Sequence, residues 1–205
     1  MPYVVGKRKS KSSREVAVLR DDKSPLNWTG FVEGCHRLWT QINEDSWKPD
    51  LVVAVNRGGA AVAGVIGYTP QVAGTSFGVA IAEDDRKKDV VLSLPPIADP
   101  KNCEVLLVDI QMRSGESLEI VEQALKKKKF ISERMRAAVL VLANLRDVPS
   151  SGKPVKLTLK DFPCGYNGPR PAYESWLKRL HYLGFVCKHI PKHPWEPWKE
   201  VKKRR

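Results

Sequence analysis

The sequence predicts an α/β fold with a mostly parallel, twisted sheet and helices on both faces. Short, continuous apolar runs at residues 51–55, 104–109 and 137–143 are typical of strands that are buried on both faces. Between these runs, apolar residues recur at helical spacing. This alternation of strand and helix predicts parallel pairing with helices packed against the sheet.

The bulk composition is that of an ordinary globular protein. A chain of 205 residues with 42% hydrophobic content can build one domain with a substantial core. No apolar run approaches the length of a membrane span, and the basic N-terminus has no apolar signal region, so we expect a cytoplasmic protein without membrane contact. The four cysteines are widely spaced and lack metal-ligand spacing, which predicts reduced thiols.

The net charge of +12 favours an anionic ligand. Basic side chains cluster at residues 7–11, 126–129 and 202–205. Such clusters bind nucleic acid, nucleotides or polyphosphates, but they also serve solubility alone. The sequence leaves these alternatives open.

The first third of the chain predicts a tail, a helix, a strand and a second helix. Residues 1–23 show no sustained periodicity and predict a basic tail with one short strand at 15–19, so that one domain spans 24–205. Ser24 and Pro25 are a plausible helix start, and the helix runs to about Ile42 with Trp28 and Trp39 expected in the core. After the strand at 51–55, we expect a tight turn at 56–59 and a helix at 60–66.

The remaining elements follow in the order strand, strand, strand, helix, strand. Two strands at 74–81 and 90–94 flank seven consecutive charged residues at 83–89, which predict a solvated hairpin tip or a lid. A helix at 117–127 follows the strand at 104–109. Prolines and glycines indicate a loop-rich region at 145–182; the last elements expected are a helix at 172–180 and a strand at 185–189.

Asp109 occupies the place where such a sheet binds ligands. It ends the strand at 104–109, and open α/β sheets bind ligands at the carboxyl ends of their strands. Residues 113–117 lead into the next helix, where N–H groups and the helix dipole attract a phosphate. Asp109 is therefore the candidate group for orienting hydroxyls or a metal, and residues 113–117 are the candidate phosphate site.

Other common sites are not indicated. Val65 follows the glycine loop at 59–64 where a P-loop would have lysine. The four histidines show no metal-ligand spacing, and no nucleophile elbow is present.

In this order, the motifs resemble the type I phosphoribosyltransferases, particularly the bacterial and archaeal branch that handles xanthine, guanine or hypoxanthine. The resemblance runs from about Trp28 to Leu142 and returns at Pro194-Trp195-Glu196. It implies the type I phosphoribosyltransferase fold, with a small C-terminal hood at 183–205. It also implies phosphoribosyl pyrophosphate (PRPP) and a nucleobase as substrates, Mg²⁺ as cofactor, and a homodimer.

The resemblance further assigns a role to individual residues. Asp109 and Arg57 would be catalytic, with Asp109 facing the ribose hydroxyls and the metal. The pyrophosphate would lie against Asn56, Arg57, Gly58 and Gly59. The 5′-phosphate would bind Arg113, Ser114, Gly115, Glu116 and Ser117. Glu83, Asp84, Asp85, Arg86, Lys87 and Lys88 would form a lid, and the base would lie near Asn144, Ile190 and Trp195.

Some positions depart from the family pattern. Ile110 stands where relatives usually carry a second adjacent acid, and Arg113 stands where purine-salvage relatives often place Asp. Three hypotheses follow. The first is phosphoribosyl transfer to a purine-like base. The second is a PRPP- or nucleotide-binding regulator that contacts RNA or DNA through its basic segments, and the third is other chemistry on the same fold.

Overall fold

The computed structural model describes residues 14–16, 26–68, 72, 74–83, 89–112, 115–142, 155–157, 176 and 180–186. The helices are α1 (Trp28–Glu44), α2 (Asn56–Ile66), α3 (Glu116–Lys127) and a short 3-10 turn, η1 (Ser132–Arg134). The strands are β1 (Arg14–Val16), β2 (Leu51–Val55), β3 (Ser76–Glu83), β4 (Asp89–Ser93), β5 (Val105–Met112), β6 (Met135–Leu142), β7 (Val155–Leu157) and β8 (Leu180–Val186).

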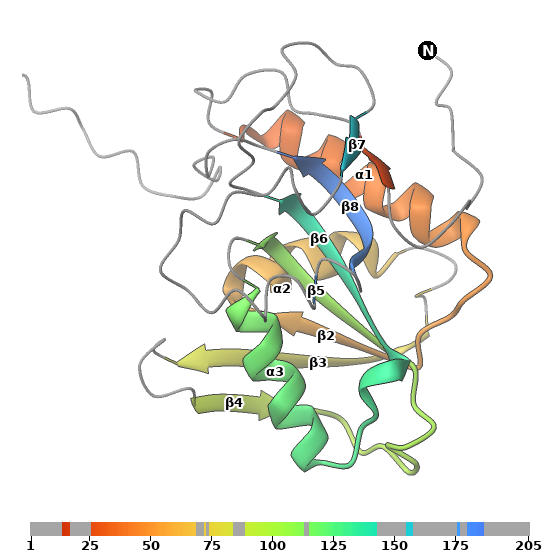
Figure 1. Ribbon diagram of the computed structural model, residues 1–205, viewed down its shortest axis with the longest axis vertical. Coiled ribbons are helices and arrows are strands. Elements are labelled where there is room, and N and C mark those ends of the chain that lie inside the picture. The colour runs from red at the N-terminus through yellow and green to blue at the C-terminus, as the bar shows by residue number, and fades with distance from the viewer. Residues whose placement is uncertain are drawn as a thin grey trace, which may run out of the picture.

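Six of these strands form the central sheet in the order β4-β3-β2-β5-β6-β8 (Figure 1). Only β3 and β4 pair antiparallel within this sheet; the other neighbours are parallel. The strands β1 and β7 pair separately as a two-stranded antiparallel sheet. The predicted fold class, a mostly parallel α/β sheet, is confirmed.

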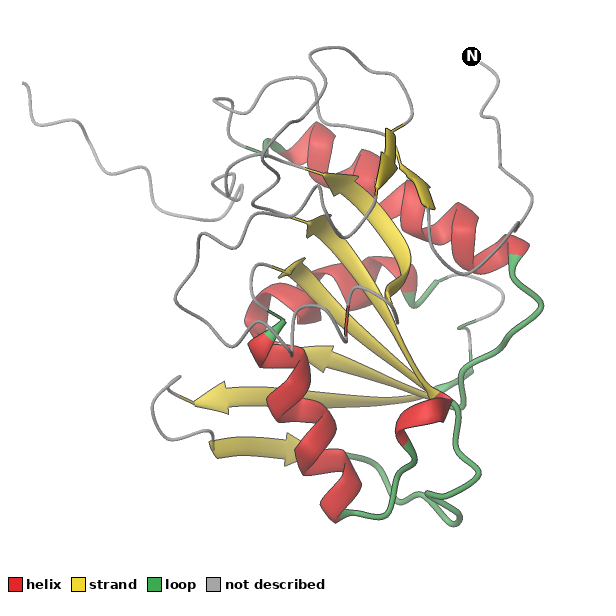
Figure 2. Ribbon diagram, in the orientation of Figure 1, coloured by secondary structure: helices red, strands yellow, loops and turns green. Residues whose placement is uncertain are grey.

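Helices cover both faces of the central sheet (Figure 2). The apolar side of α3 packs into one core cluster, whereas α1 and α2 pack into the cluster on the opposite face. Side chains of β2 alternate between the two clusters: Val53 and Val55 belong to the α3 side, Val52 and Ala54 to the α1 and α2 side. This alternation is what a strand buried on both faces requires. No described helix is both long and apolar enough to cross a membrane.

Helix α1 begins three residues later than the predicted start at Ser24 and Pro25, which lie outside the described residues. Its N-cap is Asn27, whose Oδ1 accepts a hydrogen bond from the Gly30 N–H at 2.8 Å. The buried stripe of α1 contains Phe31, Cys35, Leu38 and Ile42.

The prediction that Trp28 and Trp39 lie in the core is wrong, since they are 59% and 37% exposed. They flank the buried stripe of α1, and their indole rings contact aromatic neighbours on the same helix. Trp28 meets Phe31 edge-on at 5.8 Å between ring centroids, and Trp39 stacks on His36 at 5.5 Å.

Several element boundaries differ from the sequence prediction. Residues 56–59 are the first turn of α2, not a separate turn. The strand that was expected to end at Asp109 continues to Met112. The last strand begins at Leu180, five residues before the predicted 185, and residues 187–205 of the predicted hood lie outside the described residues.

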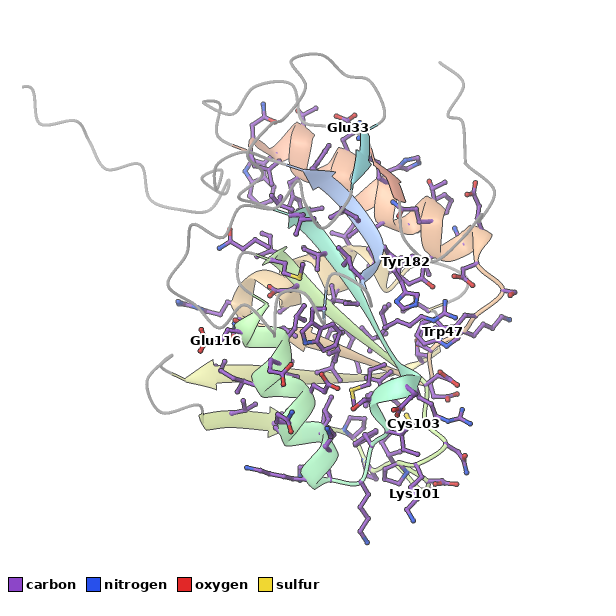
Figure 3. The ribbon with its side chains drawn as sticks, in the orientation of Figure 1. Glu33, Trp47, Lys101, Cys103, Glu116 and Tyr182 are labelled. Atoms are coloured by element: carbon purple, nitrogen blue, oxygen red, sulfur yellow. The ribbon has the colours of Figure 1, made fainter. Side chains whose placement is uncertain are left out.

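A polar network lies at the amino ends of the strands. The Arg136 guanidinium donates to Asp45 Oδ2 at 2.8 Å and to the Tyr182 hydroxyl at 3.2 Å, and it lies over the Trp47 ring at 4.4 Å from the centroid. Trp47 Nε1 donates to Glu104 Oε2 at 2.8 Å. The network therefore ties the α1–β2 connection to β5, β6 and β8. Figure 3 shows Trp47 and Tyr182 far from Glu116, which begins α3.

Arg136→Ala is expected to lower the free energy of unfolding by about 3 kcal/mol, because it leaves the largely buried Asp45 carboxylate without its cation. Urea denaturation measures the loss. The matched control is Glu33→Ala, which removes the surface pair with Arg37 and should cost less than about 1 kcal/mol. Equal losses in the two variants would contradict a stabilising role for the network.

Candidate functional site

The chain changes its direction of winding between the neighbouring strands β2 and β5. β2 leads through α2 to β3 on one side of the sheet, whereas β5 leads through α3 to β6 on the other. The two helices accordingly lie on opposite faces. Open α/β sheets bind ligands outside the carboxyl ends of their strands at such a switch point. The candidate site therefore consists of the β2–α2 and β5–α3 junctions.

Asp109 lies in β5 at this switch point. The preceding residue, Val108, pairs with Ala54 of β2, and Asp109 itself pairs with Val139 of β6. Its carboxylate is 6% exposed and accepts a hydrogen bond from the Ile110 N–H at 2.7 Å. Burial raises the pKa of Asp109 to about 7, although hydrogen bonds from the backbone N–H groups of Ile110 and Gln111 act in the opposite direction. The group therefore changes charge near neutral pH.

Ile110, where the resemblance implies a second acid, is part of the hydrophobic core. Since β5 continues through this position, the side chain is buried in the cluster on the α1 and α2 face. It lies directly under Gly58 of α2: a Cβ added to Gly58 would be 2.3 Å from Ile110 Cγ2. This aliphatic side chain supports the first turn of α2.

Gly59 brings the same turn against the backbone of β5. A Cβ at this position would be 2.3 Å from the Val108 carbonyl oxygen and 3.3 Å from the Asp109 Cα. Only glycine allows this approach. The two glycines that were expected to admit a pyrophosphate therefore also set the contact between α2 and Asp109.

The N-terminus of α2 has the features of an anion site. The helix follows β2 without a loop, and no side chain of the described residues caps its first N–H groups. Arg57 is exposed in this first turn. Asn56 has a φ of 57°, and its Oδ1 accepts a hydrogen bond from the Ala82 N–H at 2.9 Å.

The N-terminus of α3 resembles that of α2 in lacking a described side-chain cap, but its first turn contains two glutamates. Gly115 precedes the helix with a φ of 77°, a left-handed conformation that favours glycine. No described side chain caps the helix, and Ser117 is partly exposed in the first turn. Glu116 and Glu119 in that turn interact favourably with the helix dipole but oppose a bound phosphate.

The structure thus brings residues 56–59, Asp109 and residues 115–117 to one end of two adjacent strands. For Glu83 only the backbone, at the end of β3, is described. Arg113, Ser114, Asp84, Asp85, Arg86, Lys87, Lys88, Asn144, Ile190 and Trp195 lie outside the described residues, and their roles stay predictions. The hydrogen bond from the Ala82 N–H to Asn56 cannot be predicted from the sequence, because no sequence pattern marks a single backbone donor.

Asp109 is the candidate metal ligand. Among the described residues, no three His, Cys, Asp or Glu side chains are grouped so as to hold a metal ion. Mg²⁺ usually takes one or two carboxylates together with ligand phosphates and water. One carboxylate therefore fits a magnesium ion that is bound mainly by a phosphorylated ligand.

Together, the fold and the site define a doubly wound α/β protein with a candidate anion site at its switch point. Residues 24–169 match the phosphoribosyl transferase domain, and the chain belongs to this family. No curated protein matches the sequence.

Solved structures with a similar fold include phosphoribosyltransferases. The purine phosphoribosyltransferase from Pyrococcus horikoshii Ot3 shares 20% identity with a TM-score of 0.57, over 87% of this chain and 97% of that one. A hypoxanthine phosphoribosyltransferase from Staphylococcus aureus shares 16% identity with a TM-score of 0.49, over 83% and 80% of the two chains. At 20% identity, the likeness to the Pyrococcus protein concerns the fold alone.

The contact between α2 and β5 predicts opposite effects for two glycines of the same helix. Gly59→Ala should lower the free energy of unfolding by about 2 kcal/mol, since its methyl group collides with the Val108 carbonyl. Gly64→Ala should raise it by about 0.5–1 kcal/mol, because nothing lies within 4 Å of an added Cβ and alanine favours the helix. Thermal denaturation of both variants measures this. The contact would be refuted if both variants were stabilised.

Asp109 makes the stability of the protein depend on pH. Its pKa is about 7 in the folded protein against an ordinary 3.8, so between these values the folded state holds a proton that the unfolded chain has released. The stability contribution is complete below about pH 4 and is lost as the pH rises through about 7. In Asp109→Asn this loss, at most about 4 kcal/mol, should be absent. Urea denaturation between acid and neutral pH measures the free energy of unfolding of both proteins. The raised pKa of Asp109 would be contradicted if this free energy changed with pH in the same way in wild type and Asp109→Asn.

Proposed function

We propose that this protein is a phosphoribosyltransferase that transfers the phosphoribosyl group of PRPP to a purine-like base, with Mg²⁺ as cofactor. The observation that carries the proposal is the contact between the uncapped N-terminus of α2 and β5 at Asp109, made by Gly58 and Gly59. This contact places the N-terminus of α2, where an anion would bind, against the strand that carries Asp109. Membership of the phosphoribosyl transferase domain family supports the same reaction.

Each end of PRPP has a matching part of the site. The carboxylate of Asp109 would accept hydrogen bonds from the ribose hydroxyls. Arg57 and the first turn of α2 would bind the pyrophosphate, and the backbone N–H groups of residues 115–117 would bind the 5′-phosphate. Arg113 and Ser114 would complete the phosphate site, residues 83–88 the lid, and Asn144, Ile190 and Trp195 the base pocket.

The reaction exchanges one bond at the anomeric carbon of the ribose. A nitrogen of the base forms the new bond and releases its proton to solvent, while the bond to the pyrophosphate oxygen breaks and negative charge accumulates on the leaving pyrophosphate. Arg57 and the dipole of α2 stabilise that charge. Bound Mg²⁺ would supply further neutralisation of the pyrophosphate oxygens.

A second candidate function is a PRPP- or nucleotide-binding regulator. Ile110 favours it, because one ribose hydroxyl lacks the charged partner that a second acid would provide. In this case the basic segments would contact RNA or DNA, with an affinity that falls steeply with salt.

Pyrophosphate release from PRPP with Mg²⁺ distinguishes the two functions. Hypoxanthine, guanine, xanthine, adenine, uracil and orotate are supplied one at a time, and we expect release with a purine. Binding of PRPP in calorimetry without release for any base would favour the regulator. Light scattering of the same sample tests the proposed homodimer.

Asp109→Ala should weaken PRPP binding by about 10-fold or more, because a hydrogen bond from a ribose hydroxyl to a charged group is lost. Calorimetric titration with PRPP and Mg²⁺ measures the loss. The matched control is Asp99→Ala, which removes a carboxylate from the turn before β5, at the other end of that strand. If Asp109→Ala bound PRPP as wild type does, the site assignment would be wrong.

A further inference from the structure

Asn56 is the residue at which β2 passes directly into α2. Val55, the last residue of β2, is extended and serves as the N-cap of the helix. The next residue, Asn56, has a φ of 57°, which asparagine tolerates better than most residues. Lys129 is the other described non-glycine residue with a positive φ, but it follows the end of α3, where this conformation is common. Asn56 adopts it at the start of a helix.

The side chain of Asn56 extends the pairing of β2 with β3. Val55 pairs with Ala80, and two residues further along β3 the Ala82 N–H donates to Asn56 Oδ1 at 2.9 Å. The amide oxygen thus takes the place that a strand carbonyl would have if β2 continued. One residue therefore turns the main chain into the helix and satisfies the next donor of the sheet.

The first turn of α2 is consequently held by two strands. Gly59 packs against the backbone of β5, and Asn56 is hydrogen-bonded to β3. Ala82 also pairs with Val90 of β4, directly before the charged residues 83–89. The direction in which the first N–H groups of α2 and Arg57 point depends on both attachments.

We propose that Asn56 is a positioning residue for the pyrophosphate site. Its left-handed backbone and its hydrogen bond to Ala82 orient the N-terminus of α2 toward the pyrophosphate. The amide oxygen is committed to β3. This inference rests on the proposed function and gives the Asn56 side chain a role beyond the pyrophosphate contact that the resemblance implies.

Three substitutions separate the two properties of Asn56. Asn56→Gly keeps the left-handed backbone and loses the hydrogen bond; Asn56→Ala loses both. Asn56→Asp keeps an acceptor oxygen and tolerates the left-handed backbone. The control is Asn102→Gly, which removes a side chain that donates to Asp99 Oδ2 at 2.7 Å in an exposed turn before β5. The probes are magnesium pyrophosphate and inosine 5′-monophosphate in calorimetry, with amide hydrogen exchange at Ala82.

In Asn56→Gly we expect pyrophosphate affinity to fall by about 5- to 10-fold, while inosine 5′-monophosphate affinity stays within about twofold. Asn56→Ala should lose more pyrophosphate affinity. Exchange at Ala82 should be faster in both variants and as slow as wild type in Asn56→Asp. Asn102→Gly should leave both affinities unchanged.

Two results would overturn the inference while the proposed function stands. One is a wild-type affinity for pyrophosphate in Asn56→Gly; the other is an equal loss for both probes, which indicates general destabilisation. If the wild-type protein bound neither probe, the proposed function itself would fail and the inference with it. That failure shows in the wild type before any variant is compared.

Discussion

The close approach of α2 to β5 is the contact on which the site depends. Gly58 lies on Ile110 and Gly59 lies on the Val108 carbonyl, at positions where a Cβ would meet atoms at 2.3 Å. This close approach places the N-terminus of α2 against the backbone of β5 at Val108 and Asp109. The absence of Cβ atoms at Gly58 and Gly59 therefore determines how closely the candidate anion site at α2 approaches β5, the strand that carries Asp109.

The same contact accounts for Ile110. Successive side chains of a strand point to opposite faces, so Asp109 and Ile110 cannot share an environment as long as β5 continues through both. An acid at position 110 would lie beneath Gly58 in the apolar cluster and would need a partner there. The candidate site is thus built around one carboxylate, that of Asp109, whose own burial raises its pKa.

The sequence predicted the order of the strands along the chain because continuous apolar runs mark strands that are covered on both faces. It failed where tertiary contact decides the outcome. A glycine pair is typical of a turn, yet Gly58 and Gly59 lie in the first turn of α2. The close contact with β5, which leaves no room for a Cβ, explains why both residues are glycine. Gln111 is polar, yet it pairs with Val141 and extends the strand beyond Asp109. The apolar periodicity of α1 also did not separate its buried stripe from the flank that carries Trp28 and Trp39.

The two ends of the sheet differ in their polar contacts and backbone geometry, and this contrast supports the proposed site independently of any relative. At the amino ends of the strands, Arg136 and Asp45 form an ion pair. At the carboxyl ends, a left-handed Asn56, two helix N-termini without a described side-chain cap and a buried Asp109 occur together. Such departures from local preference cost stability and persist where they serve a ligand. Their concentration at the β2–α2 and β5–α3 junctions is the strongest physical argument that an anionic ligand binds there.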